Sequence, residues 1–179
     1  TPIKSSAASD VYKRQILYSL KKRERTLYSL RSDIFEKFGY FTKPSTGTIH
    51  PALKRLLKSN VITIRNDFSS GGKKSTYYGL ALHWQKKFND LFFTPLSENP
   101  TIFFKEIQSR IAVMSLLEDD LKETFIKDIL IRLESFMLDL QNALDDEYAS
   151  YDKYQLALLK KNIADINSYK TFINELEAQ

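Results

Sequence analysis

The sequence predicts a mainly α-helical protein with one small β-hairpin, divided into two parts of opposite charge. Three observations lead to this fold class. Apolar residues recur at helical spacings of three and four through most of the 179 residues, one stretch alternates with the period of a strand, and Gly and Pro number only five each. An apolar content of 42% with 27% charged residues is typical of a globular chain.

The net charge of +5 is unevenly distributed along the chain. Residues 1–93 carry 18 Lys and Arg against 6 Asp and Glu, a balance of +12, whereas residues 94–179 carry 9 against 16, a balance of −7. The sign changes at a Pro-containing linker, residues 94–100. We therefore expect a basic domain over residues 16–93 that faces a polyanion, and a helical domain over residues 94–179.

Residues 1–15 (TPIKSSAASDVYKRQ) differ from the rest of the chain. They lack the apolar core of a signal peptide, and the stretch SSAASDVYKRQ resembles a translated sequencing adapter. We expect this leader to be non-native. Residues 16–93 alone still carry a balance of +10, so the charge asymmetry does not depend on the leader.

The basic domain opens with three helical segments. The first begins at Ile16 and continues into the basic run at residues 21–25, and the second is predicted over residues 27–38. The third begins near Thr46 or Thr48, either of which can cap its first turn.

A hairpin follows these helices. Residues 61–68 alternate and are rich in β-branched side chains, which predicts a strand, and residues 75–81 read as its returning partner. A turn over residues 69–72 precedes Lys73 and Lys74. Three helices followed by a two-stranded ribbon with a basic, Gly-rich tip is the element order of a winged helix-turn-helix.

Helical periodicity resumes after Leu82 and continues beyond the linker in segments predicted over about 101–117, 119–147 and 152–177. The two long helices carry apolar faces too wide to be buried by one another, so a second subunit is the simplest further surface. We expect an antiparallel long-helix dimerisation domain. Its candidate contacts are Ile126, Leu130, Leu133, Met137, Leu140, Leu144, Ile163, Ile166 and Ile173.

The third helix and the hairpin tip offer side chains suited to duplex DNA. Hydroxyls and a histidine at the start of the helix can read base edges, while the cations that follow can meet phosphates. An ordinary solvated helix is the alternative, and it is favoured for each cation taken singly. The candidate DNA-binding residues are Ser45, Thr46, Thr48, His50, Lys54, Arg55, Lys58, Lys73, Lys74 and Tyr77.

Signals for an enzyme, a metal site or a membrane protein are weak. Cysteine is absent, the two histidines (His50 and His83) are far apart, and no GxSxG, P-loop or GxGxxG motif occurs. Acidic clusters at residues 118–120 and 145–147 are typical of helix ends. No apolar run approaches the ~20 residues of a membrane span. We expect a cytoplasmic protein with no cofactor, no metal and no membrane partner.

Aromatic residues lie on both sides of the linker. Such a cluster fills a core more often than it lines a ligand site, but pockets favour junctions between domains. The candidate pocket for a small hydrophobic effector consists of Trp84, Phe88, Phe92 and Phe103.

Residues 46–62 (TGTIHPALKRLLKSNVI) and 71–80 (GGKKSTYYGL) closely resemble the recognition helix and wing of PadR-like transcriptional regulators. Residues 27–39 (LYSLRSDIFEKFG) resemble that family's second helix. Residues 103–120 are similar to the C-terminal helical domain of the larger PadR subfamily, as in virulence-activator-alpha-type regulators. The resemblance implies a dimeric winged-helix repressor, often relieved by a small phenolic or otherwise hydrophobic effector.

Four positions depart from the family pattern. His50 stands where Tyr is usual, Leu27 replaces a usual Gly, and Ala81 and Trp84 replace the Thr and Gly that commonly follow the second wing strand. We expect a homodimeric, sequence-specific DNA-binding repressor. The alternative is a winged-helix protein-interaction adaptor without specific DNA binding.

Overall fold

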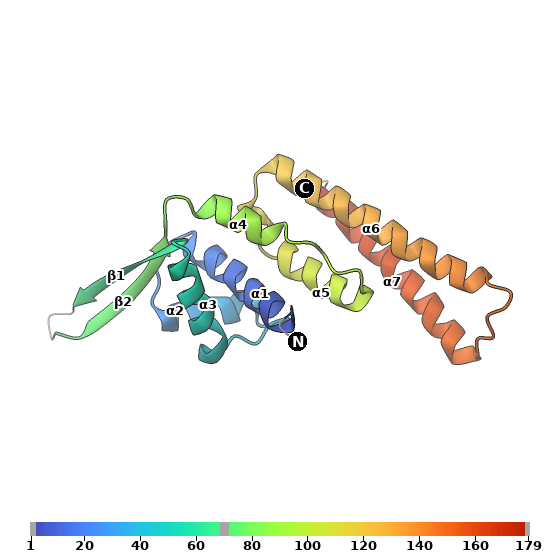
Figure 1. Ribbon diagram of the computed structural model, residues 1–179, viewed down its shortest axis with the longest axis horizontal. Coiled ribbons are helices and arrows are strands. Elements are labelled where there is room, and N and C mark those ends of the chain that lie inside the picture. Colours follow the sequence, from blue (N-terminus) through green and yellow to red (C-terminus); the bar gives the residue numbers. More distant parts are fainter. Residues whose placement is uncertain (1–2, 69–71, 178–179) are drawn as a thin grey trace. The chain divides into compact units, whose positions relative to one another are not determined.

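A computed structural model of the chain describes residues 3–68 and 72–177. Figure 1 shows a helical fold with one hairpin that projects from it, which confirms the predicted fold class. The elements are α1 (Ile3–Leu20), α2 (Leu27–Phe38), α3 (Thr46–Lys58), β1 (Ile62–Phe68), β2 (Lys74–Leu80), α4 (Trp84–Phe92), α5 (Pro100–Ile111), the 3₁₀ turn η1 (Met114–Leu116), α6 (Asp119–Asp145) and α7 (Lys153–Glu177).

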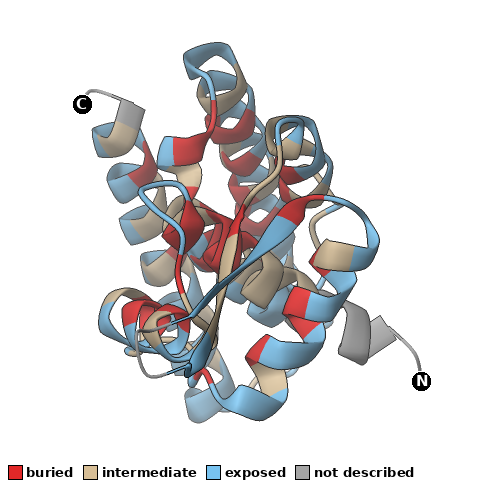
Figure 2. Ribbon diagram, turned by 90° about the vertical axis from the view of Figure 1, so that its left-hand side faces the viewer, coloured by how far each residue is buried: buried red, intermediate tan, exposed pale blue. Residues whose placement is uncertain are grey.

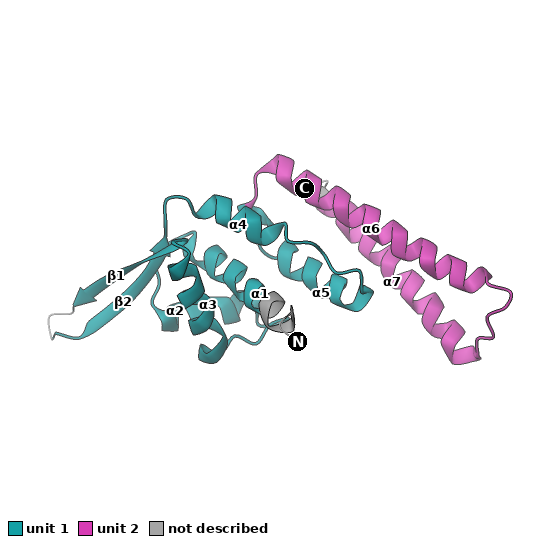
Figure 3. Ribbon diagram, in the orientation of Figure 1, with its two compact units in different colours: residues 1–116 teal, residues 117–179 magenta. Residues whose placement is uncertain are grey.

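The chain forms two compact units, residues 1–116 and residues 117–179 (Figure 3). The linker over residues 94–100, where the charge changes sign, lies inside the first unit. The domains expected over residues 16–93 and 94–179 therefore stay predictions from charge.

The core of the first unit is built from one face of each of its helices (Figure 2). Apolar residues at helical spacing are buried there, while the intervening polar residues face solvent, as amphipathic helices require. The fully buried side chains include Ile16, Leu17, Leu30, Ile34, Phe38, Ile49, Leu53 and Leu56.

α1 ends at Leu20, directly before the basic run in which the sequence predicts the helical pattern to end. Arg25 instead pairs with β2 in an isolated antiparallel bridge: its N–H donates to the carbonyl of Tyr78 at 3.0 Å and its carbonyl accepts from the N–H of Tyr78 at 2.8 Å. This long-range pairing outweighs the helical propensity of Lys and Arg.

The predicted leader, residues 1–15, continues α1 in the structure from Ile3 onward. Its Arg14 and Gln15 are buried, yet Arg14 Nε and Gln15 Oε1 have no hydrogen-bond partner among the described residues. Buried polar atoms are normally paired. Ser19 Oγ and Arg110 Nε, outside the leader, are unpaired as well, so the non-native leader stays a prediction.

β1 and β2 form an antiparallel hairpin whose register runs from Ile62↔Leu80 at the base to Phe68↔Lys74 at the outer end. Ile62 is buried, whereas the rest of β1 is exposed, so the hairpin leaves the core as it lengthens. Of the predicted turn, residues 69–71 lie outside the described residues, and Gly72 has a φ of 74°, a conformation that favours glycine.

The second unit is a hairpin of two long antiparallel helices, α6 and α7. Lys170 on α7 forms an ion pair with Glu134 on α6, and both helices carry buried apolar residues. The described residues contain no helix that is long and apolar enough to cross a membrane.

Candidate nucleic-acid interface

The outward face of α3 carries a line of basic residues. Burial of Ile49, Leu53 and other apolar residues fixes which side of the helix faces inward. His50, Lys54 and Lys58 are spaced by four residues, so they lie along one line on the exposed side. Within the described part of the chain, none of the three forms a hydrogen bond or an ion pair. Their donors are thus available to an external polyanion.

The beginning of α3 is held by a reciprocal cap. Ser45, and not Thr46 or Thr48, is the N-cap: its Oγ accepts from the Thr48 N–H at 3.2 Å, and Thr48 Oγ1 accepts from the Ser45 N–H at 2.9 Å. Thr48 Oγ1 also donates to the Ser45 carbonyl at 2.9 Å. These two candidate DNA contacts therefore fix the start of the helix, whereas Thr46 is exposed beside them.

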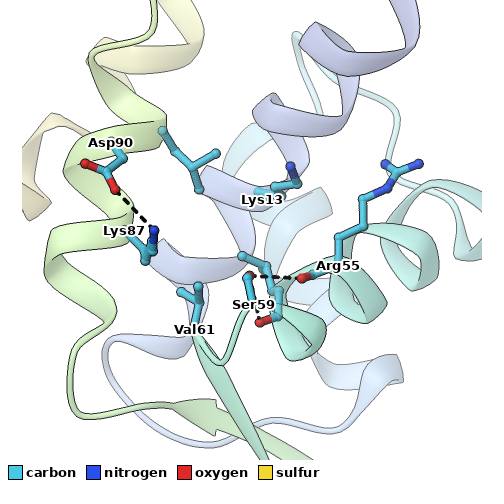
Figure 4. Close-up of a pocket in the computed structure, with 8 residues that line it drawn as sticks. Lys13, Arg55, Ser59, Val61, Lys87 and Asp90 are labelled. Carbon is cyan, nitrogen blue, oxygen red and sulfur yellow. Dashed lines mark hydrogen bonds and ion pairs between the residues drawn. The ribbon is translucent and has the colours of Figure 1, made fainter.

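Arg55 lies apart from the basic line on α3. Its Nη1 donates to Ser9 Oγ on α1, and its side chain lines a cavity of about 320 Å³ (Figure 4). Lys87 and Asp90 of α4 form an ion pair of 3.5 Å on the opposite wall. The full lining is Lys13, Arg55, Leu56, Ser59, Val61, Lys87, Asp90 and Leu91. Lys13, which belongs to the predicted leader, forms part of the wall from α1.

The charged residues of the wing lie in two places, at its outer end and around Arg65. Lys73 and Lys74 lie at its outer end, as predicted. Tyr77 lies beneath Arg65, whose guanidinium carbon is 4.7 Å from the ring centroid. Arg65 also pairs with Glu24 at 2.8 Å and with Asp67 at 3.3 Å, and its hydrogen bonds with these carboxylates raise the pKa of the Arg65 guanidinium.

A buried network that the sequence did not reveal fixes the base of the wing. The side chain of Arg25 donates from Nη2 to Asp33 Oδ1 at 2.7 Å and from Nε to the Ser19 carbonyl at 2.9 Å. Lys37 Nζ reaches both oxygens of Asp33 at 2.9 Å. Because the Arg25 backbone pairs with β2, this residue joins α1, α2 and the wing.

The candidate dimerisation residues lie on α6 and α7, as expected. Five of them are buried within the single chain and the other four are partly buried. The buried ones are Ile126, Leu133, Met137, Ile166 and Ile173, and the partly buried ones are Leu130, Leu140, Leu144 and Ile163. Their role in dimerisation stays a prediction.

The candidate effector residues also include both buried and partly buried side chains. Phe88, Phe92 and Phe103 are fully buried, and Trp84 is partly buried with Lys21 Nζ 5.0 Å from the ring centroid. In the part of the chain that the structure describes, no three His, Asp or Glu side chains are grouped so that they could hold a metal ion.

Comparison with known proteins finds a similarity over the basic helices and the wing. Residues 16–88 match the sequence profile of the transcriptional regulator PadR-like family. That family consists of transcription regulators. No curated protein is similar enough to the chain to count as a match.

Solved structures with a similar fold include Bacillus subtilis PadR in complex with operator DNA (22% identity, TM-score 0.43, 93% of this chain and 96% of that chain). The same protein in complex with p-coumaric acid gives 22% identity and a TM-score of 0.41 over 94% and 97% of the two chains. A PadR-like transcription factor from Bacteroides fragilis gives 20% identity and a TM-score of 0.45 over 51% and 85%.

Proposed function

We propose that this chain, which is PadR-like over its residues 16–88, is a cytoplasmic, homodimeric repressor that binds specific duplex DNA through α3 and the wing. The observation that carries the proposal is the line of His50, Lys54 and Lys58 on the outward face of α3. A helix with this face fits the major groove, where His50 can meet base edges and the lysines can meet phosphates.

The structure supports a second contact beside this helix. Lys74, at the outer end of the wing, is exposed. The Arg25 network joins the wing to the helices, so α3 and the wing approach one duplex together. In a dimer, two copies of this surface would bind half-sites about 34 Å apart, one turn of DNA.

Selection of bound duplexes from a random pool tests the DNA part. The wild-type protein is expected to enrich a near-palindromic sequence, and affinity for it should fall steeply with rising salt because Lys contacts release counterions. Charge reversal of Lys54, Lys58, Lys73 and Lys74 to Glu should abolish this binding. Lys86→Glu, which changes one exposed lysine on α4 and none on α3 or the wing, is the control for a single charge change.

No enrichment, or binding that survives the four reversals, would contradict the proposal. Failure to enrich together with capture of a protein partner in a stable complex would favour the adaptor alternative. The dimer part is tested by light scattering at micromolar concentration, where a monomer contradicts it.

The proposal includes relief of repression by a small hydrophobic or phenolic effector. Trp84 supports it, because its partly exposed ring lies beneath the ammonium of Lys21 at the edge of an aromatic region. The probe is p-coumaric acid, the molecule bound to Bacillus subtilis PadR. It should weaken binding to the selected duplex in the wild type and not in Trp84→Ala; unchanged binding in the wild type would refute this part.

A further inference from the structure

The cavity of about 320 Å³ lies between the last turn of α3 and the helix α4 (Figure 4). This volume is at the lower end of the range for ligand sites and corresponds to about ten water molecules, so the cavity suits a compact ligand. The described residues that line it include none of the candidate effector residues.

The buried part of the lining is apolar and belongs to the core. Leu56 and Val61 are 1% and 2% exposed. The chain turns sharply between them, because Asn60 has a φ of 55° and the Val61 N–H donates to the Leu56 carbonyl at 3.0 Å. Ser59 Oγ donates to the carbonyls of Arg55 and Leu56 at 3.0 and 3.2 Å. These carbonyls at the end of α3 are therefore paired, which weakens their repulsion of an anion.

Cations stand on opposite walls of the cavity. Arg55 lies on the α3 wall and Lys87 on the α4 wall, and both side chains are exposed. The guanidinium of Arg55 donates to the neutral hydroxyl of Ser9 and has no carboxylate partner among the described residues. Lys87 pairs with Asp90 at 3.5 Å, but both side chains are more than half exposed, so this pair is weak. Both cations are thus available to an anion in the cavity.

A third cation, Lys13 on α1, completes the rim. Its Nζ is already paired with Asp10 at 2.8 Å, and it belongs to the predicted leader, so the site relies on Arg55 and Lys87. A phosphate monoester fits cations on two walls better than a carboxylate does. Its three terminal oxygens point in different directions, so one edge can meet the planar fork of Arg55 while another oxygen meets the ammonium of Lys87.

The rest of the lining describes the body of the ligand. The Asp90 carboxylate and Ser59 Oγ can accept hydrogen bonds from hydroxyl groups, and Leu56 and Val61 can pack against carbon atoms. We propose that the cavity binds a small phosphorylated compound, with its phosphate between Arg55 and Lys87 and its hydroxyl-bearing carbon body against Asp90. This site does not depend on the proposed function, and it gives Arg55 a role other than DNA contact.

Titration calorimetry of the full chain with glycerol 3-phosphate tests the site. Saturable binding is expected, with no binding of glycerol alone. Arg55→Ala and Lys87→Ala should each weaken the affinity roughly tenfold, because each removes a charged donor from the phosphate. Lys86→Ala is the matched control, since Lys86 is the neighbouring exposed lysine on α4 and is not part of the lining, and it should change the affinity less than about twofold.

Asp90→Asn tests the site in the opposite direction. It removes the acidic partner of Lys87 and keeps a side chain that can form hydrogen bonds, so the affinity for glycerol 3-phosphate should rise by about two- to fivefold. A gain in affinity cannot result from a failure to fold. An unchanged or lower affinity in this variant would overturn the inference.

Three other results would also overturn it: no saturable binding of glycerol 3-phosphate, wild-type affinity in Arg55→Ala, or an equal loss in Lys86→Ala. Competition identifies the source of the phosphate. Displacement of glycerol 3-phosphate by duplex DNA at low salt would assign the cations to the DNA backbone, and displacement by p-coumaric acid would make the cavity the effector site; either contradicts the inference. Binding of glycerol 3-phosphate by a chain that selects no duplex would refute the proposed function alone.

Discussion

Removal of the Asp33 carboxylate is expected to destabilise the first unit more than any other single change to its polar residues. Asp33 and Arg25 are both buried, with side-chain exposures of 8% and 7%. In Asp33→Ala, Arg25 would keep only the Ser19 carbonyl at 2.9 Å and the Ser29 hydroxyl at 3.4 Å as acceptors. Breaking a buried ion pair in this way costs about 3–5 kcal/mol.

Lys37 adds little to this loss. Its side chain is 30% exposed, so its ammonium can turn to water when Asp33 is removed, and exposed pairs contribute about 1 kcal/mol or less. We therefore expect Asp33→Ala to lower the free energy of unfolding by about 3–4 kcal/mol, and Lys37→Met to lower it by less than about 1 kcal/mol.

Urea unfolding followed by the fluorescence of Trp84 measures this effect, because Trp84 is the single tryptophan and lies in the first unit. For a slope of about 2 kcal/mol per molar urea, the midpoint should fall by about 1.5–2 M. The double variant Arg25→Met/Asp33→Leu should recover most of the loss, since apolar residues of similar size can replace a buried pair. A loss below about 1 kcal/mol in Asp33→Ala would refute the reasoning.

Two further changes test other parts of the first unit. Ser45→Ala removes the cap of α3 and should cost about 1 kcal/mol of stability, measured by the same urea titration, with Ser59→Ala at the opposite end of the helix for comparison. Arg14→Leu should instead raise stability by about 1–2 kcal/mol at pH 7. Burial and the neighbouring Arg110 lower the pKa of Arg14 to about 10, so the folded state holds this proton less tightly than the unfolded state. This difference in proton affinity lowers the free energy of unfolding of the wild type by roughly 3 kcal/mol at every pH below about 10, and the effect declines as the pH rises further. Arg14→Leu removes this destabilisation, but it also removes the hydrogen bonds to the Leu91 carbonyl and Ser109, which reduces the net gain in stability. A lower urea midpoint for Arg14→Leu would contradict this account.

The sequence predicted the ends of a helix correctly where neighbouring residues determine them. α2 has the predicted bounds, because an amphipathic repeat ends there at Gly39. The cap of α3 was placed one or three residues too late, at Thr46 or Thr48, since Ser45, Thr46 and Thr48 are all suitable capping residues and only the backbone geometry selects among them. The sequence placed the end of α1 near the basic run, but it gave no sign of the bridge from Arg25 to Tyr78, which lies 53 residues later.

In the candidate site, too, features set by local sequence were predicted and features set by distant contacts were not. The outward positions of His50, Lys54 and Lys58 follow from the helical repeat, so the sequence predicts them. The Arg25–Asp33 pair joins residues eight positions apart on different elements, and no repeat indicates it. Arg65 could have been found, because the strand register places it opposite Tyr77, but its partner Glu24 comes from the segment between α1 and α2, and no local pattern indicates that contact.

The bridge between Arg25 and Tyr78 has a consequence for how operators can vary. Since one residue ties the base of the wing to both α1 and α2, we expect the position of the wing relative to the helices to change little when a duplex binds. If α3 and the wing bind one half-site as proposed, their two contacts must keep a fixed spacing, and an insertion of one base pair between them should be tolerated poorly. Variation in the length of the operator is left to the stretch between half-sites.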